Sequence, residues 1–333
     1  MTSSSKNHKA FVTPKKGVMK NLCLRLATFF SLLFSPHLAA SEPSFPPVYS
    51  DIKDIYHPTI DDYRLLQQYL SSEKRDLSQL CDFAWVVKNI KIIGESAEEL
   101  PRSECIAVNC SKEDKENCII LYASFNRNYP QALMRLANLI KTSDFQGHVL
   151  YRIGGWPNTE EGDLLLAHVP YAFKVCMFQE AKRLGYKRCL WLDTAFIPVV
   201  SLNTIFKMID EKGYFVVDCS THKIGPFMNT EAAAAFGLTL EETQKIPSCS
   251  AGIFGIDFRN RTGALLVDRL YTAAHDKNAF FSARSDQNAL SIILYQSGIT
   301  DFISLKRIPH TEIGQTVQPD SLFVLDRLFA QNG

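Results

Sequence analysis

Apolar strand-like runs alternate with amphipathic helix-like segments through the middle of this chain, and this alternation limits its fold more than any other feature. The predicted buried strands lie at 118–123, 148–153, 188–192 and 214–217. The predicted helices lie at 131–141, 170–184 and 202–212, and two of them are followed by a glycine. Strands separated by helices are typical of an α/β domain, in which a mostly parallel sheet is flanked by helices.

The same pattern continues on both sides of this stretch. Further strands are predicted at 105–108, 251–256 and 302–305, and further helices at 61–72, 259–275 and 286–296. Residues 83–93 have the composition of one strand or of two. We therefore predict a small α+β lead-in over residues 61–116, followed by the main domain over residues 117–330.

The N-terminal 60 residues have a composition of their own. Five lysines lie within residues 1–20, an apolar run follows at 26–34, and small residues end the segment near Ser41. This order predicts that residues 1–40 are a signal peptide, with an uncleaved signal anchor as the alternative. Residues 41–60 are proline-rich and indicate a linker. The expected location is the secretory pathway or outside the cell. The alternatives are the cytoplasm, if residues 1–40 are not a leader, and attachment to the membrane, if the leader is not cleaved.

Charge and cysteine content exclude some functions. The 333 residues carry a formal net charge of +1, and no basic cluster with interleaved aromatic residues follows the N-terminus. Nucleic acid is therefore not an expected partner. Nine cysteines are present without any C-x-x-C pair, which argues against a structural zinc site. Disulfides in an exported protein and buried free thiols are both open interpretations.

The segment 188–196, RCLWLDTAF, places a single acid directly after a buried strand. In open α/β sheets, ligands bind outside the carboxyl ends of the strands. Asp193 is therefore either a cap for the next turn or a ligand for a hard cation such as Mg²⁺ or Mn²⁺.

Other candidate positions have an ordinary structural explanation beside a functional one. Asp286 and Gln287 open a predicted helix, where an acid is favoured by the helix dipole, or they bind sugar hydroxyls. Ala251 and Gly252 begin a strand, where small residues permit close packing or close approach of a ligand. Lys174 is either solvated or placed to neutralise a diphosphate, and His310 is either a loop residue or a metal ligand. No acyl-transfer serine motif and no Walker A loop occur.

Taken in order, these segments resemble the GT-A fold of nucleotide-sugar glycosyltransferases over roughly residues 117–315. The turn SFNRNY at 124–129 resembles the nucleotide-binding turn, LWLD at 190–193 the approach to the Asp-x-Asp motif, and SAGI at 250–253 the Asn-Ala-Gly strand of glycogenin-like and galactosyltransferase-like members. DQNAL at 286–290 resembles their Asp-Gln-Asp segment, and His310 with Gly314 their late His-x-x-Gly.

The resemblance implies a transferase that takes a nucleoside diphosphate sugar as donor and a glycan or protein as acceptor, with Mn²⁺ or Mg²⁺ as a candidate cofactor. It implies catalytic roles for Asp286 and Gln287 and a metal site at Asp193 and His310. The donor-binding residues would be Ser124, Asn126, Tyr129, Lys174, Ala251 and Gly252.

The sequence also departs from the family pattern. Ala195 stands where the second acid of Asp-x-Asp is expected, Ser250 replaces the asparagine, and Asn288 replaces the second acid of Asp-Gln-Asp. A metal-independent enzyme, in which Lys174 or an arginine meets the diphosphate, is therefore an alternative. Two rival functions are a non-catalytic carbohydrate-binding or interaction protein with a degenerate GT-A fold, and a nucleotidyltransferase.

Overall fold

A computed structural model describes residues 102–124, 128–154, 166, 169–276 and 278–331. The predicted leader, the linker and residues 61–101 of the lead-in lie outside these ranges, so their predictions stay predictions. Within the described ranges, no helix has both the length and the apolar character needed to cross a membrane.

The centre of the fold is a six-stranded sheet with the strand order β1-β3-β2-β4-β7-β6. Its strands are β1 (Arg102–Val108), β2 (Asn117–Ala123), β3 (Gly147–Ile153), β4 (Arg188–Leu192), β6 (Tyr214–Lys223) and β7 (Pro247–Asp257). β2 pairs in parallel with both β3 and β4, whereas β1 and β7 pair antiparallel with their neighbours. Four strands therefore run in one direction, and the predicted α/β class with a mostly parallel sheet is confirmed.

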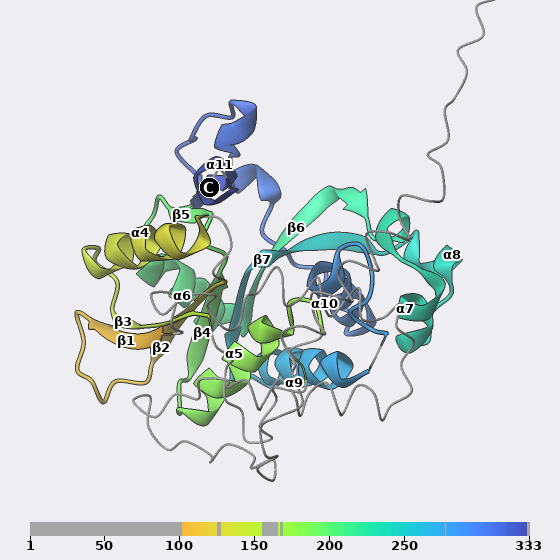
Figure 1. Cartoon of the computed structure of the whole chain (residues 1–333), viewed down its shortest axis with the longest axis horizontal. Coiled ribbons are helices and arrows are strands. Elements are labelled where there is room, and N and C mark those ends of the chain that lie inside the picture. Colours follow the sequence, from red (N-terminus) through yellow and green to blue (C-terminus); the bar gives the residue numbers. More distant parts are fainter. Residues whose placement is uncertain (1–101, 125–127, 155–165, 167–168, 277, 332–333) are drawn as a thin grey trace, which may run out of the picture. The chain divides into compact units, whose positions relative to one another are not determined.

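Helices cover both faces of this sheet (Figure 1). One face packs against α4 (Tyr129–Lys141) and α6 (Leu202–Lys212), and the other against α5 (Ala172–Arg183), α9 (Arg261–His275) and α10 (Ser285–Gln296). Because side chains alternate along a strand, Ile119 and Leu121 of β2 join the first core while Ile120 and Tyr122 join the second. The central strands are thus buried on both faces, which explains their continuous apolar runs.

The helix ends follow local sequence signals. Pro130 lies in the first turn of α4, where its missing N–H removes no helical hydrogen bond. α6 ends at Gly213, which has a φ of 83°. A Cβ at this position would lie 2.2 Å from the side chain of Asn260, so a side chain is excluded by space as well as by conformation.

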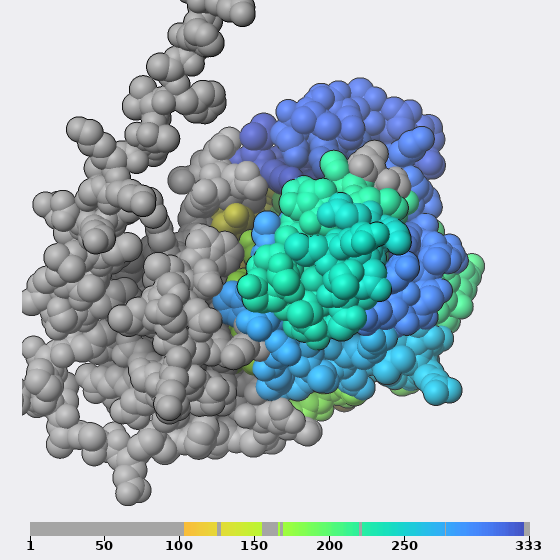
Figure 2. All heavy atoms as spheres, turned by 90° about the vertical axis from the view of Figure 1, so that its right-hand side faces the viewer, coloured from red at the N-terminus to blue at the C-terminus, as the bar shows by residue number. Residues whose placement is uncertain are grey.

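Short elements complete the fold beyond the main sheet. They are β5 (Phe196–Pro198), η3 (Gly225–Phe227), α7 (Thr230–Ala235), α8 (Leu240–Thr243), η4 (Leu305–Arg307), η5 (Thr311–Ile313), β8 (Phe323–Leu325) and α11 (Arg327–Gln331). Ile224 and Ile246 flank α7 and α8 and pack against Ile292 of α10. Figure 2 shows the teal surface of α7 and α8 beside the blue surface of segments that follow them in the chain.

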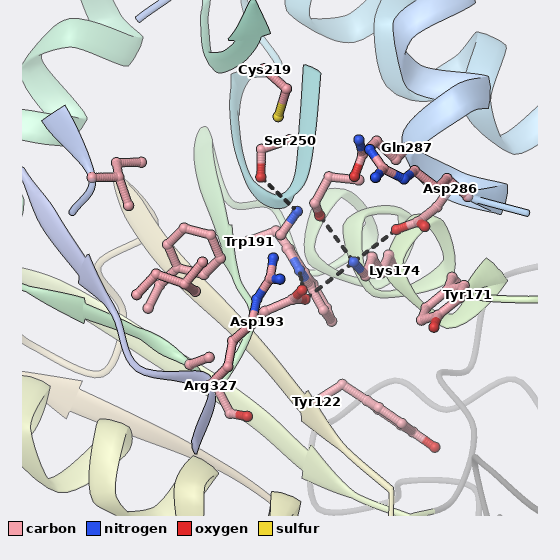
Figure 3. Close-up of a pocket in the computed structure, with 18 of the residues that line it drawn as sticks. Tyr122, Tyr171, Lys174, Trp191, Asp193, Cys219, Ser250, Asp286, Gln287 and Arg327 are labelled. Atoms are coloured by element: carbon pink, nitrogen blue, oxygen red, sulfur yellow. Dashed lines mark hydrogen bonds and ion pairs between the residues drawn. The ribbon is translucent and has the colours of Figure 1, made fainter. Parts of the chain in front are cut away.

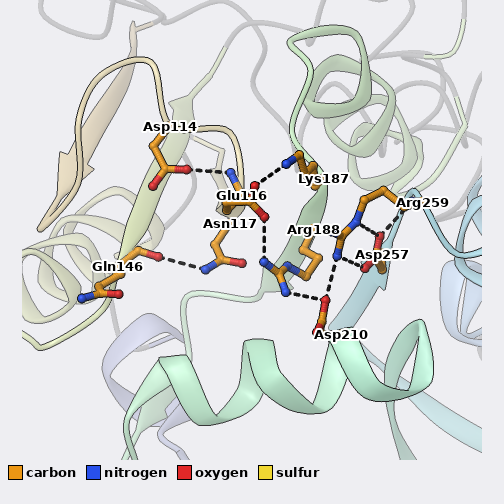
Figure 4. A network of polar contacts seen from close by, with 9 residues as sticks. All are labelled: Asp114, Glu116, Asn117, Gln146, Lys187, Arg188, Asp210, Asp257 and Arg259. Carbon is orange, nitrogen blue, oxygen red and sulfur yellow. Dashed lines mark hydrogen bonds and ion pairs between the residues drawn. The ribbon is translucent and has the colours of Figure 1, made fainter.

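An ion-pair network joins the strands at the edge where β2 and β4 begin (Figure 4). Arg188 contacts Glu116 at 3.0 Å and Asp210 at 2.6 Å, and Lys187 also pairs with Glu116. Arg259 continues the network to Asp210 and Asp257. Because β7 runs opposite to β4, its last residue meets the first residue of β4 in this network. Cations and acids compensate one another here, at the sheet edge opposite Asp193.

One sequence expectation changes, and one open alternative is decided for the described residues. The strand predicted at 302–305 is wrong: only Ile303 forms an isolated bridge, with Val217, and η4 begins at Leu305. The chain enters η4 directly after this bridge: Ser304 caps η4, its side chain accepting from the N–H of Lys306, and the side chain of Asp218 accepts from the N–H of Leu305. The seven cysteines within the described ranges are all free thiols, whereas Cys23 and Cys81 lie outside those ranges.

Candidate functional site

A pocket of about 590 Å³ opens at the carboxyl ends of β2 and β4 (Figure 3). Nine of the ten predicted site residues line it: Ser124, Tyr129, Lys174, Asp193, Ala251, Gly252, Asp286, Gln287 and His310. The tenth, Asn126, lies outside the described residues. Segments far apart in the sequence therefore meet around one cavity, whose volume suits a small-molecule ligand.

The ammonium group of Lys174 is the centre of this site. Its Nζ lies 2.8 Å from Oδ2 of Asp286 and 3.1 Å from Oδ1 of Asp193, and it donates to the carbonyl oxygen of Ala251 at 2.9 Å. A lysine ammonium has three N–H donors, and here three acceptors surround it. Lys174 thus links α5, the end of β4, β7 and the start of α10.

Burial and charge act in opposite directions on this cluster. Burial of Lys174 lowers its pKa, but the carboxylates of Asp193 and Asp286 outweigh burial and raise the pKa overall. Burial raises the pKa of Asp286, and the nearby Lys174 opposes this effect only in part. Lys174 therefore stays charged at neutral pH and holds both acids in place.

Asp193 is positioned by its neighbours in the chain and in the sheet. Its Oδ1 accepts a hydrogen bond from Nε1 of Trp191 at 2.7 Å, and its backbone N–H donates to the carbonyl oxygen of Gly252 at 2.7 Å. A Cβ on Gly252 would lie 2.6 Å from the ring of Phe196 and 2.9 Å from Oδ2 of Asp193. Glycine is therefore required for β7 to approach the acid this closely.

The start of α10 presents Asp286 in its first turn, where a negative charge is favoured by the helix dipole. Gln287 follows, and its Nε2 donates to the hydroxyl oxygen of Ser248 at 2.7 Å. The amide of Gln287 thus connects α10 to β7, which is a structural contact in addition to its place on the pocket wall.

His310 lines the pocket from the segment between η4 and η5. Burial lowers the pKa of this imidazole, Glu312 raises it and Arg327 lowers it again, with a net decrease. The imidazole is therefore neutral at pH 7. Its Nε2 is buried and has no hydrogen-bond partner among the residues that the structure describes.

The donor set does not fit a resident divalent metal. Across the described ranges, no group of three or more His, Cys, Asp or Glu is close enough to hold one. Ala195 supplies no second acid, and the Lys174 ammonium lies against Asp193, where a metal would compete with a fixed positive charge. The described residues around Asp193 and His310 therefore do not favour a resident divalent metal, and the metal site predicted there stays a prediction.

Sequence reasoning missed several residues of the pocket. Arg284, Arg327 and Cys219 line it, as do the aromatic residues Tyr122 and Tyr171. Arg284 could have been found, because it lies only two residues before the predicted site residue Asp286. Arg327 had no such signal: it reaches the pocket only because β8 pairs with β5 just beyond Asp193.

An aromatic wall lies beside the ionic cluster. The rings of Tyr122 and Phe173 stack with centroids 4.4 Å apart, and Trp191 and Tyr171 lie 5.9 and 6.0 Å from Phe173. Tyr171 has a φ of 61°, a left-handed conformation that costs about 1 kcal/mol or more for a residue with a side chain. All four residues line the pocket, and Tyr171, which is 37% exposed, is the most accessible of them.

Fold and pocket together define an α/β protein with an ionic binding site at the carboxyl edge of its parallel strands. No protein-family model and no curated protein matches the sequence. Among solved structures, the chain is similar to the galactosyltransferase LgtC in complex with donor and acceptor sugar analogs, with 11% identity over 63% of this chain and 86% of that chain and a TM-score of 0.36. It is also similar to mouse xyloside xylosyltransferase 1 in its apo form, with 10% identity over 65% and 98% of the two chains and a TM-score of 0.37.

Proposed function

We propose that this protein transfers a sugar from a nucleoside diphosphate sugar to a glycan or protein acceptor in this pocket. The observation that carries the proposal is the cluster in which Lys174 holds Asp193 and Asp286 at the carboxyl edge of the sheet. Two carboxylates fixed beside an aromatic wall form a site that can bind sugar hydroxyls and a flat ring together.

The two acids have distinct settings. Asp193 has a side chain that is 42% exposed and is therefore open to ligand hydroxyls, whereas the side chain of Asp286 is 15% exposed. As the bond from the sugar to the diphosphate breaks, positive charge develops on the sugar, and fixed carboxylates stabilise that charge. Lys174 acts as a positioning residue, because its N–H donors are directed at these acids and at Ala251.

The N-terminal sequence supports an exported or lumenal location for this reaction, with the cytoplasm or a membrane anchor as the alternatives. N-terminal sequencing of the protein purified from its source tests the location: a mature chain beginning near Ser41 supports export, and a chain that retains residues 1–40 contradicts cleavage.

The transfer itself is tested with a panel of nucleoside diphosphate sugars. Donors that bind the folded state raise the melting temperature, and turnover releases the nucleoside diphosphate. Asp286→Asn keeps the shape of the side chain and removes its charge, and we expect a loss of about a hundredfold or more in kcat/KM. Asp268→Asn, at an exposed position of α9, is the matched control and is expected to leave activity unchanged.

Two results would contradict the proposal. One is that no member of the panel raises the melting temperature or is consumed. The other is that Asp286→Asn keeps full activity in a folded protein.

A binding protein without catalysis is the second candidate. The observation that favours it is the same cluster, since Lys174 already neutralises part of the charge of both acids and Ala195 replaces an expected acid. Saturable binding of a nucleotide sugar, without release of nucleoside diphosphate in the presence of any acceptor tried, would favour this candidate. Release of pyrophosphate from a nucleoside triphosphate, when a sugar phosphate is supplied as acceptor, would instead indicate a nucleotidyltransferase.

A further inference from the structure

The pocket holds more fixed positive charge than its acids neutralise. Three cations line it, Lys174, Arg284 and Arg327, against the two carboxylates Asp193 and Asp286. Neither arginine has a carboxylate within ion-pair distance among the described residues. Elsewhere in the described ranges, Arg135, Arg152, Arg188 and Arg259 each pair with at least one acid.

Lys174 is not available to compensate the charge of a ligand. Its ammonium already meets two carboxylates and one carbonyl oxygen, at 2.8 to 3.1 Å. An anionic ligand must therefore be met by other groups, and the guanidinium groups of Arg284 and Arg327 are the fixed cations that remain on the pocket wall.

The two arginines come from different parts of the chain and line the same pocket. Arg284 directly precedes α10, and its guanidinium carbon lies 3.6 Å from the centroid of the Phe227 ring, which fixes its orientation. Arg327 is the first residue of α11, and Figure 3 shows its side chain directed into the pocket toward Asp193. Cys219 of β6 lines the same pocket as both arginines. Burial and Asp218 raise the pKa of its thiol overall, whereas Arg284 and Arg327 each lower it.

We propose that Arg284 and Arg327 form a pyrophosphate-binding pair that takes the place of a divalent cation. Guanidinium groups bind phosphate oxygens with two parallel hydrogen bonds, and two of them suit the two phosphates of a nucleoside diphosphate. The pair explains how the pocket can bind this anion although its donor set does not fit a resident metal. The inference rests on the proposed function, since it names the groups that meet the donor's diphosphate.

The test is calorimetric titration of the full chain with inorganic pyrophosphate and with a panel of nucleoside diphosphates, in EDTA and again with Mn²⁺. We expect binding in EDTA, with an affinity that Mn²⁺ changes by less than about twofold. Arg284→Gln and Arg327→Gln should each weaken binding by roughly tenfold to a hundredfold, because each removes hydrogen bonds to a charged ligand. Arg261→Gln, at an exposed position at the start of α9, is the matched control and should not change the affinity.

Arg284→Lys and Arg327→Lys keep the positive charge and remove the two parallel hydrogen bonds of the guanidinium group. They keep the proposal testable if a glutamine variant fails to fold. We expect each lysine variant to bind more tightly than its glutamine counterpart and more weakly than the wild type. Unfolding curves establish that every variant is folded.

The outcomes separate this inference from the proposed function. Nucleoside diphosphates that bind only with Mn²⁺, with affinity independent of both arginines, overturn the inference and leave the transferase proposal standing. Arginine-dependent binding of pyrophosphate in EDTA, without binding of any nucleotide sugar, supports the anion site and overturns the transferase proposal. Absence of binding by the wild-type protein in both conditions overturns both.

Discussion

At the scale of single residues, Lys174 is the residue on which the geometry of the site depends. Lys174→Met removes the cation and leaves the negative charges of Asp193 and Asp286 without their common partner. We expect a loss of roughly 2 kcal/mol in the free energy of unfolding at pH 8, less than for a fully buried pair because Asp193 is 42% exposed.

The loss caused by Lys174→Met should depend on pH. Burial raises the pKa of Asp286, and removal of Lys174 takes away the charge that opposes this. A raised folded-state pKa favours folding below the unfolded value, and that contribution disappears as pH rises through the folded value. The variant should therefore lose stability between pH 5 and pH 8. The wild-type Lys174 contribution stays constant over this window, because its pKa is raised above 10.5.

Urea unfolding of both proteins at pH 5 and pH 8 measures this difference. Lys174→Arg keeps the charge and serves as the control that should show little pH dependence. A Lys174→Met protein whose stability is equal at the two pH values would contradict the assigned ion pairs.

Tyr171 provides a second test at the same scale. Its φ of 61° is unfavourable for tyrosine and suits glycine. We expect Tyr171→Gly to keep or raise the melting temperature, because relief of the strained conformation offsets the lost ring contacts, and to weaken nucleotide-sugar binding by about tenfold. Thermal unfolding and donor titration on one preparation check both parts. A fall in both stability and affinity would assign the ring a packing role.

At the scale of elements, strands β2, β3 and β4 were predictable because burial on both faces gives short segments that are mostly apolar, with six apolar residues in a row in β2 and four in β4. β5 and β8 were not predictable, since three residues carry no period. The order of the motifs along the sequence predicted ten site residues, and nine of them line one pocket. The contacts of Lys174 could not be predicted from the sequence, because the packing of α5 against β7 and α10 decides which acids its side chain reaches.

A buried ion pair joins α5 to the sheet. Nη2 of Arg152 in β3 lies 2.7 Å from Oε1 of Glu180, and both side chains are less than 5% exposed. Glu180→Gln leaves the Arg152 charge buried and unpaired, so we expect the free energy of unfolding to fall by about 3–5 kcal/mol.

Chemical denaturation measures this loss. The exposed pair of Lys182 and Asp268 provides the comparison, and Asp268→Asn should change stability by about 0.5 kcal/mol or less. Equal effects of the two substitutions would mean that Arg152 finds another partner when Glu180 loses its charge.

At the scale of the whole described domain, the segment 305–331 completes the pocket from outside the main sheet. β8 pairs with β5, and the backbone N–H of Asp326 donates to the carbonyl oxygen of Ala195. Arg135 of α4 binds Asp326 at 2.9 Å and lies over the ring of Phe329 at 3.9 Å. These contacts hold Arg327 at the pocket, so we expect ligand affinity to depend on the docking of this segment.

Arg135→Gln tests that coupling. The Arg135–Asp326 pair is about one quarter exposed, so we expect only about 1 kcal/mol of lost global stability. The segment should open more often at its C-terminal end, because that end loses its ion pair with α4, and hydrogen exchange in peptides from 305–331 should accelerate while that of β2 and β4 stays slow. Since an open segment removes Arg327 from the pocket, pyrophosphate affinity should fall several-fold, in proportion to the fraction of molecules that remain closed. Arg261→Gln again serves as control, and unchanged exchange in 305–331 together with weaker binding would show that Arg135 acts on the ligand by another route.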